Sequence, residues 1–398
     1  MLDAEFLATI TERAEYVAGQ LHDDIIARVV ERITWHLVNN KKYLLTASDK
    51  WRIETLTAAG LLLHDIEKEV AKKTGLEDKE IRQAFRDAGI RSVRYDNEVF
   101  RDAGISAKAL LQSPAMIRVL ERDYKKTLGE WKNYTGTTVR SAYQLFINEC
   151  DKAMVQVRSG AETWGQAYMR AVDEISKNGV EVVYPSGHRD TIETATARAL
   201  RTGVSQSTGS ITVARAMEND IVCFITTSHF DPRPTHYPWQ GQVFWIDWDA
   251  LQQIEGITGY HAKASPELKA KYKEFVSTTG YGTVTGLCGA NCRHSFLPFV
   301  DGVSQNHMPV FDEKEARKEY ELRQKQRALE RGIRKTKRDK LSLETAIDNC
   351  DDEVTKTELQ KSLLKTQNRL KLQNQNYIKF CDDNKLKTQE VRLKLAAS

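Results

Sequence analysis

Apolar residues recur every three or four positions along most of the first 180 residues, a spacing that lines one side of an α-helix. The clearest stripe is made by Ile25, Ile26, Val29, Val30, Ile33 and Leu37. The pattern predicts helix over residues 5–73, with an N-cap at Ser48 and a division at Gly60. Gly75 stands where a glycine commonly ends a helix.

Shorter helices are predicted over residues 78–87 and 106–127, with Pro114 kinking or dividing the second. Helical spacing returns over 139–157 and 161–177. The period then changes, and the β-branched run at 180–184 predicts a strand. A helix is expected to start after Asp190 or Thr191 and to reach about Glu218.

Two further strands are predicted, at residues 221–227 and 242–246. Beyond residue 312 the chain contains no proline, and Gly332 is its one helix-breaking residue. This pattern predicts two helices of roughly 35 and 30 residues, broken near 349–352, that pack as a helical hairpin or a coiled coil. The expected fold is therefore α+β and mostly helical.

A chain of 398 residues with 40% apolar and 29% charged residues has the size and composition of two or three globular domains. We expect a helical N-terminal region at 1–134, a central α+β domain at 135–310 and a charged helical tail at 311–398. No apolar run approaches the ~18 residues of a membrane span, and the N-terminus lacks the features of a signal peptide. Six scattered cysteines do not suggest a disulfide framework, so reduced thiols in a cytosolic setting are expected.

The formal net charge of +4 is too small to indicate nucleic-acid binding by the whole chain, but the charge is unevenly spread. Residues 311–398 contain 22 Lys and Arg against 16 Asp and Glu. A basic cluster in this tail consists of Arg334, Lys335, Lys337, Arg338 and Lys340. Two interpretations are open: a solvated helix face, or sequence-independent contact with the phosphates of DNA.

Reactive residue types gather in the stretch from 228 to 294, which holds four of the nine histidines. Cys288, Cys292 and His294 supply two thiolates and an imidazole within seven residues, and His229, Asp231 or His236 could complete a zinc tetrahedron. The alternative is a glycine-rich turn in which both thiols pack as small apolar groups.

An enzymatic interpretation starts from the loop that contains His229, Asp231, Arg233 and His236. Two histidines and a cation that binds phosphate could cleave RNA by general acid–base catalysis. The same prolines and aromatic residues suit a rigid structural joint, and no phosphate loop, dinucleotide fingerprint, nucleophile elbow or HExxH helix accompanies the loop. A nuclease or nucleotide-modifying domain is the alternative function.

Two motifs together carry a family resemblance: DPRPTH at 231–236 with WQG at 239–241, and CGANCRH at 288–294. Their fold-defining residues are Pro232, Pro234, Trp239, Gln240, Gly241, Asn291 and Arg293. Over residues 151–340 the sequence resembles the minor capsid protein 2 family of tailed bacteriophages, which is related to phage head morphogenesis proteins. The wider group often ends its second motif in Cys-x-Cys, whereas position 294 is His here.

The resemblance implies a structural protein of the virion, present in few copies at or near the portal vertex and acting in head assembly. Its implied partners are the portal protein, the major capsid protein or both, without a membrane. Non-specific DNA contact and self-association through the tail are compatible with this role, as is assembly in the host cytoplasm. The resemblance brings no catalytic residue.

Overall fold

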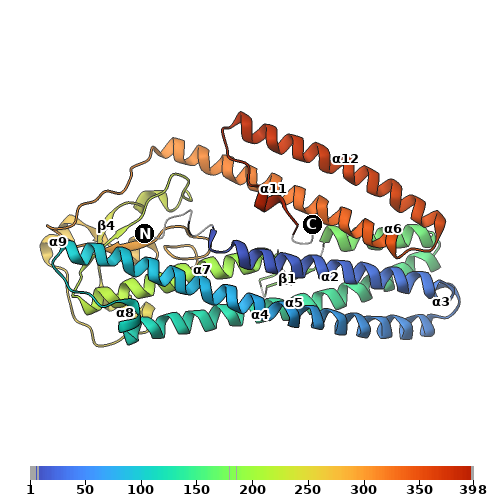
Figure 1. Ribbon diagram of the computed structural model, residues 1–398, viewed down its shortest axis with the longest axis horizontal. Helices are drawn as coiled ribbons and strands as arrows, with labels where there is room; N and C mark the ends of the chain where they lie inside the picture. Colours follow the sequence, from blue (N-terminus) through green and yellow to red (C-terminus); the bar gives the residue numbers. More distant parts are fainter. Residues whose placement is uncertain (1–5, 7–8, 179, 185, 396–398) are drawn as a thin grey trace. The chain divides into compact units, whose positions relative to one another are not determined.

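The computed structural model describes residues 6, 9–178, 180–184 and 186–395, and these are mostly helical with small sheets, as predicted (Figure 1). The longer helices are α2 (Glu12–Asn39), α4 (Ser48–Asp102), α5 (Pro114–Arg158), α6 (Trp164–Asn178), α7 (Ile192–Glu218), α11 (Glu313–Asp348) and α12 (Glu353–Asp383). The shorter ones are α3 (Lys41–Thr46), α8 (Trp248–Glu255), α9 (Pro266–Lys271), α10 (Phe275–Thr279), α13 (Glu390–Leu393), η1 (Leu110–Gln112) and η2 (Tyr237–Trp239). The strands are β1 (Glu181–Val183), β2 (Arg189–Thr191), β3 (Cys223–Thr226), β4 (Val243–Trp245), β5 (Lys273–Glu274) and β6 (Phe296–Pro298).

Contacts divide the chain into two compact units, each built from three stretches of sequence. The first unit combines Asp78–Trp131 and Ala197–Arg323 with the chain up to Ala14. The second combines Glu15–Glu77, Lys132–Thr196 and Gln324 onward. The division at residues 134 and 310 stays a prediction about domains, because contact units are not the same as segments that fold alone. No helix in the described part of the chain is both long and apolar enough to cross a membrane.

The long helices correct several predicted boundaries. α4 continues through Gly60 and Gly75 for 55 residues, so the predicted division, the predicted helix end and the separate helix at 78–87 are wrong. Each glycine costs a helix only about 1 kcal/mol, which burial of the apolar side of α4 offsets.

Pro114 is the first residue of α5 rather than a kink within a helix. A proline is favourable there because the first turn of a helix has no acceptor for its backbone N–H groups.

Other predicted elements agree with the structure: β1, α7, β3 and β4 lie within a few residues of their expected places. The two tail helices, of 36 and 31 residues, are also confirmed.

Among the described residues of the second unit, the regular elements are helices apart from the β1–β2 hairpin. Within it, α2 packs on the first part of α4, where Arg32 and Asp65 form an ion pair of 2.8 Å. α11 and α12 form an antiparallel hairpin, since Gln326 contacts Tyr377 and Asp339 pairs with Arg369. Whether this hairpin forms a coiled coil stays a prediction.

A buried ion network joins three elements of the second unit. Arg338 of α11 donates to Asp23 of α2 over 3.0 Å and to Glu193 in the first turn of α7 over 2.6 Å. His22 of α2 lies 2.7 Å from the other oxygen of Glu193. All four residues are buried. Burial alone would raise the pKa of Glu193, but Arg338 and His22 hold this pKa well below its usual range.

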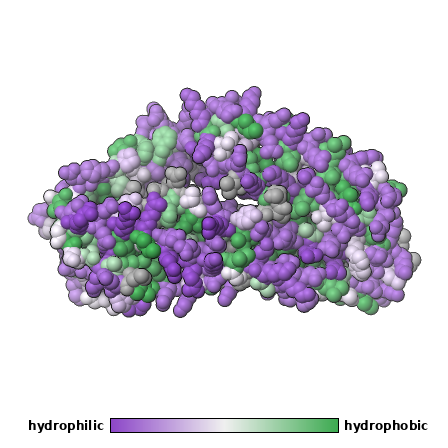
Figure 2. Space-filling model, viewed as in Figure 1, coloured by the Kyte–Doolittle hydropathy of each residue, from purple (hydrophilic) through white to green (hydrophobic). Residues whose placement is uncertain are grey.

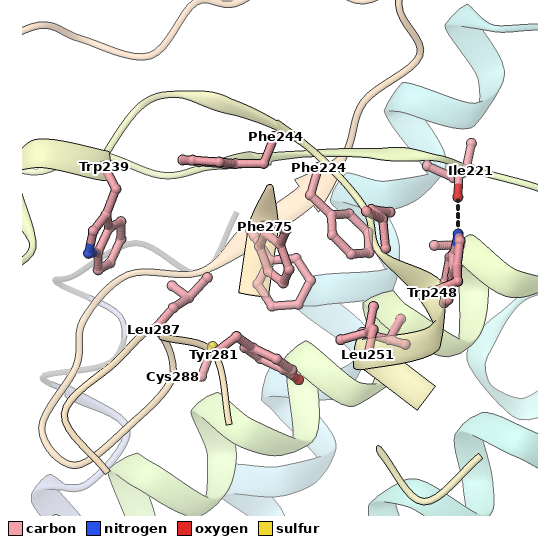
Figure 3. Close-up of a cluster of buried hydrophobic side chains, with 14 of the residues drawn as sticks. Ile221, Phe224, Trp239, Phe244, Trp248, Leu251, Phe275, Tyr281, Leu287 and Cys288 are labelled. Atoms are coloured by element: carbon pink, nitrogen blue, oxygen red, sulfur yellow. Dashed lines mark hydrogen bonds between the residues drawn. The ribbon is translucent and has the colours of Figure 1, made fainter. Parts of the chain in front are cut away.

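The first unit is built around a four-stranded sheet of order β5-β4-β3-β6. Strand β3 is central and antiparallel to both β4 and β6, while β4 and β5 run parallel. Aromatic residues fill the core behind it: Phe224 and Phe275 lie with ring centres 5.0 Å apart (Figure 3). Trp248 of α8 closes one end by donating its indole N–H to the carbonyl of Ile221 (Figure 3).

Candidate functional site

The sheet brings the two sequence motifs together. Thr226, which ends β3, pairs with Phe296, which begins β6. The chain that leaves β3 and the chain that enters β6 therefore emerge at the same end of the sheet. A backbone hydrogen bond extends this pairing beyond the two strands, since the N–H of Thr227 donates to the carbonyl of Ser295 over 2.9 Å. Residues 228–241 and 288–295 consequently form one structure, which we call the motif knot.

The turn from residue 288 to 292 is held in an unusual backbone conformation. Cys288 and Asn291 have φ values of 59° and 57°, in the left-handed region that non-glycine residues rarely adopt. Such a conformation persists only where surrounding contacts enforce it. Here the N–H of Cys292 donates to the carbonyl of Gly289, and the side chain of Arg233 donates to the carbonyl of Ala290.

The loop residues proposed for catalysis are engaged in structural contacts. Arg233 holds the turn, and Arg293 pairs with Asp231 over 2.8 Å. Asp231 also lies 3.3 Å from Nδ1 of His229. Burial alone would raise the pKa of Asp231, but His229 and Arg293 keep this pKa below its usual range. Both guanidinium groups are thus bound to groups of the knot itself.

His236, Cys292 and His294 meet in the interior of the knot. Their potential ligand atoms all lie within 4.8 Å of one another. Each residue exposes 2% or less of its surface, and Trp239 packs on both imidazole rings at centroid distances of 4.7 Å. Burial lowers the pKa of both histidines, so their rings are neutral near pH 7.

Cys288 does not join this group. Its Sγ lies 3.5 Å from the position that a Cβ on Gly209 of α7 would occupy, so the thiol packs towards that helix. Burial raises the pKa of Cys288. All six cysteines of the chain are free thiols in the structure. Of the metal-binding residues that the sequence proposed, the structure therefore brings together His236, Cys292 and His294.

The remaining motif residues shape the knot. Gln240 accepts hydrogen bonds from the backbone N–H of His229 and from the ring of His294 through one amide oxygen, each over 3.1 Å. Gly241 has a φ of 66° and donates its N–H to the carbonyl of Thr227. Pro232 is buried, whereas Pro234 is exposed. These contacts make the motif knot a closely packed structural element. Its interior also holds three side chains, His236, Cys292 and His294, whose atoms could bind a metal ion.

The basic cluster of the tail is only partly exposed. Arg338 lies in the buried ion network, so it is not available to a phosphate in this structure. Arg334 donates to the carbonyl of Arg392, and Lys340 pairs with Glu344 over 3.2 Å. Lys337 is half-buried, and burial lowers the pKa of its amine. Lys335 is exposed.

A second basic surface lies on α12 and was missed by the sequence analysis. Residues 359–381 contain no Asp or Glu, a signal visible in the sequence. The five basic residues of this stretch are exposed: Lys361, Lys365, Arg369, Lys371 and Lys379. At about 100° per residue they fall within an arc of roughly 160° on the helix. The buried residues Leu359, Tyr377 and Cys381 lie on the opposite side.

Comparison with known proteins gives the class of the protein. A structural protein of Lactococcus phage LL-H is 24% identical over 305 residues, covering 73% of this chain and 76% of the relative. A structural protein of Lactococcus phage mv4 is 42% identical over 79 residues, covering 20% of this chain and 63% of the relative. No solved structure matches the chain. Both relatives are thus phage proteins named as structural proteins.

The family follows from a match over nearly the whole chain. The model of phage minor capsid protein 2 matches residues 9–379. The chain therefore belongs to the phage minor capsid protein 2 family, as its motifs indicated, and is a structural component of the virion.

Proposed function

We propose that this minor capsid protein acts in head assembly at or near the portal vertex, bound to the portal protein, the major capsid protein or both. A protein present in few copies needs a position that itself occurs few times in the head, and the portal vertex is such a position. The observation that carries a structural role is the closed motif knot, whose two arginines bind the knot's own carboxylate and carbonyl groups. Leu364 and Leu372 are exposed on α12 and offer apolar area to a protein partner or a second copy.

The test of this role is a phage in which the gene is disrupted. We expect heads that are misassembled or poorly filled, and copurification of the tagged protein with portal or major capsid protein from infected cells. Particles with normal DNA content and normal infectivity in the absence of the protein would contradict the proposal.

The basic face of α12 is proposed to contact DNA without sequence preference. Phosphate contacts by lysine and arginine release counterions, so binding weakens steeply as salt rises. The face offers five cations, of which Lys361 pairs with Glu358 and Arg369 with Asp339 (Figure 2 shows mainly hydrophilic side chains along α12). Residues 359–381 themselves contain no carboxylate. The charge is spread along the helix, which suits an extended polyanion better than a compact ligand.

Replacement of Lys361, Lys365, Lys371 and Lys379 by glutamine is expected to weaken DNA binding. The slope of log Kobs against log salt concentration should fall by roughly 3 to 4, because each lost phosphate contact accounts for about 0.9. Fluorescence anisotropy with random-sequence duplexes at several salt concentrations measures the slope.

A matched control replaces four exposed lysines outside the tail, namely Lys68, Lys72, Lys79 and Lys125. This variant has the same net charge as the α12 variant. Equal losses of DNA affinity in the two variants would show that overall charge, rather than the face of α12, determines binding. No DNA binding by the unaltered protein at low salt would also refute the proposal.

A further inference from the structure

We propose that His236, Cys292 and His294 bind one Zn²⁺ through His236 Nδ1, Cys292 Sγ and His294 Nδ1. The site is distinct from the DNA and partner contacts proposed above, and it does not depend on them. It also replaces Cys288 of the motif by His236, which lies more than fifty residues earlier in the chain.

The distances suit a tetrahedral zinc ion. Cys292 Sγ lies 3.8 Å from His236 Nδ1 and 3.7 Å from His294 Nδ1. With Zn–S near 2.3 Å and Zn–N near 2.0–2.1 Å, a sulfur and a nitrogen ligand of one tetrahedron stand about 3.6 Å apart. Both sulfur–nitrogen distances therefore already suit the ion, and the two nitrogens lie within 4.8 Å of each other.

The hydrogen bonds of the two rings set their tautomers. His236 Nε2 lies 2.8 Å from the carbonyl oxygen of Thr285, which can only accept, so this nitrogen carries the proton. His294 Nε2 faces the side-chain oxygen of Gln240. That atom is fixed as an acceptor because the backbone N–H of His229 also donates to it. In neutral rings, both Nδ1 atoms then present lone pairs to the same sulfur.

The thiol cannot satisfy both rings. Its one S–H donates to a single Nδ1, which leaves the other lone pair facing sulfur in a buried site. A zinc ion bound to the thiolate satisfies both nitrogens at once. Metal-binding histidines commonly donate their second ring N–H to a carbonyl or side-chain oxygen, which is the arrangement that Thr285 and Gln240 provide.

A backbone donor also points at the proposed sulfur ligand. The N–H of His294 donates to Cys292 Sγ over 3.4 Å. The described residues supply three ligands, and zinc sites of this kind complete the tetrahedron with water. Because the ligands are buried, the ion would link the loop after β3 to the turn before β6.

Zinc content and cobalt spectroscopy of the full-length protein test the proposal. We expect about one zinc per chain. Replacement of zinc by Co²⁺ should give a thiolate-to-cobalt charge-transfer band. Less than about 0.1 zinc per chain, with no band on titration of the unaltered protein with Co²⁺, would overturn the site.

Matched variants identify the ligands. Cys292→Ser should lose the cobalt band, whereas Cys288→Ser should keep both the band and the zinc. Loss of the band in Cys288→Ser with retention in Cys292→Ser would refute the ligand set.

A milder pair of variants avoids a folding failure. Gln240→Ala removes the acceptor of His294 and should lower zinc affinity about 10- to 100-fold, measured by competition with a chromogenic chelator. Gln242→Ala is the control, since this exposed side chain donates to the carbonyl of Pro238 and does not contact the three ligands. Equal affinities of these two variants would contradict the tautomer argument.

Discussion

Replacement of Arg338 by methionine is expected to destabilise the second unit by about 3 kcal/mol or more. The substitution leaves Asp23 and Glu193 buried at the place where the guanidinium paired with both. Removal of one partner from a buried ion pair costs about 3–5 kcal/mol, because the remaining charge has lost both water and its partner. Hydrogen exchange of peptides from α2 measures the effect, and their protection should fall roughly a hundredfold.

Two further variants make this result specific. Lys335→Met removes an exposed cation of the same helix and should change stability by less than about 0.5 kcal/mol. Addition of Asp23→Asn and Glu193→Gln to the Arg338 variant should restore part of the loss, because no uncompensated charge then remains. The same protection in the Arg338 and Lys335 variants would refute the importance of the network.

The second large effect is expected from Gly286→Ala in the first unit. A Cβ on Gly286 would lie 1.9 Å from the carbonyl oxygen of Gly280, which belongs to the backbone and cannot rotate away. Overpacking commonly costs 1–3 kcal/mol, and a clash with backbone belongs at the upper end, about 3 kcal/mol. The melting temperature should fall by roughly 6–12 °C for a unit of this size.

Near-ultraviolet circular dichroism follows this transition, since it reports on the aromatic core around Phe224, Phe275 and Trp248 (Figure 3). Gly129→Ala is the control within the same unit. Outside its chain neighbours and the backbone of its own helix, no atom lies within 4 Å of its added Cβ. Alanine is also the better helix former by about 1 kcal/mol. Equal melting temperatures for the two variants would show that the segment around Gly286 adjusts freely.

Local sequence signals predicted several long helices well. The two tail helices were found because no proline interrupts the chain beyond residue 312, and α7 because Asp190 or Thr191 offers an N-cap. The same reasoning failed at Gly60 and Gly75, where tertiary packing outweighs a weak local preference. Strands β5 and β6, of two and three residues, are too short to produce a recognisable period.

The candidate site was predicted in composition but not in arrangement. The motifs named His236, Cys292 and His294, yet spacing alone favoured Cys288 because it lies near Cys292 in the chain. The pairing of β3 with β6 decides which groups meet, and that pairing joins segments about seventy residues apart. The burial of Arg338 was equally invisible, because an arginine in a basic run has the same local pattern on either side of a helix.

The pairing of Arg338 with Asp23 and Glu193 also makes the tail a part of the folded second unit. A charged helical tail resembles an appendage that could be truncated without affecting the fold of the rest of the chain. Here Glu193 and Asp23 depend on a cation that is translated about 145 residues after the first of them. Until the ribosome has made α11, the nascent second unit contains two carboxylates without the guanidinium that pairs with both. Its folding is therefore completed late in synthesis, and shortened chains that end before α11 should be poorly soluble.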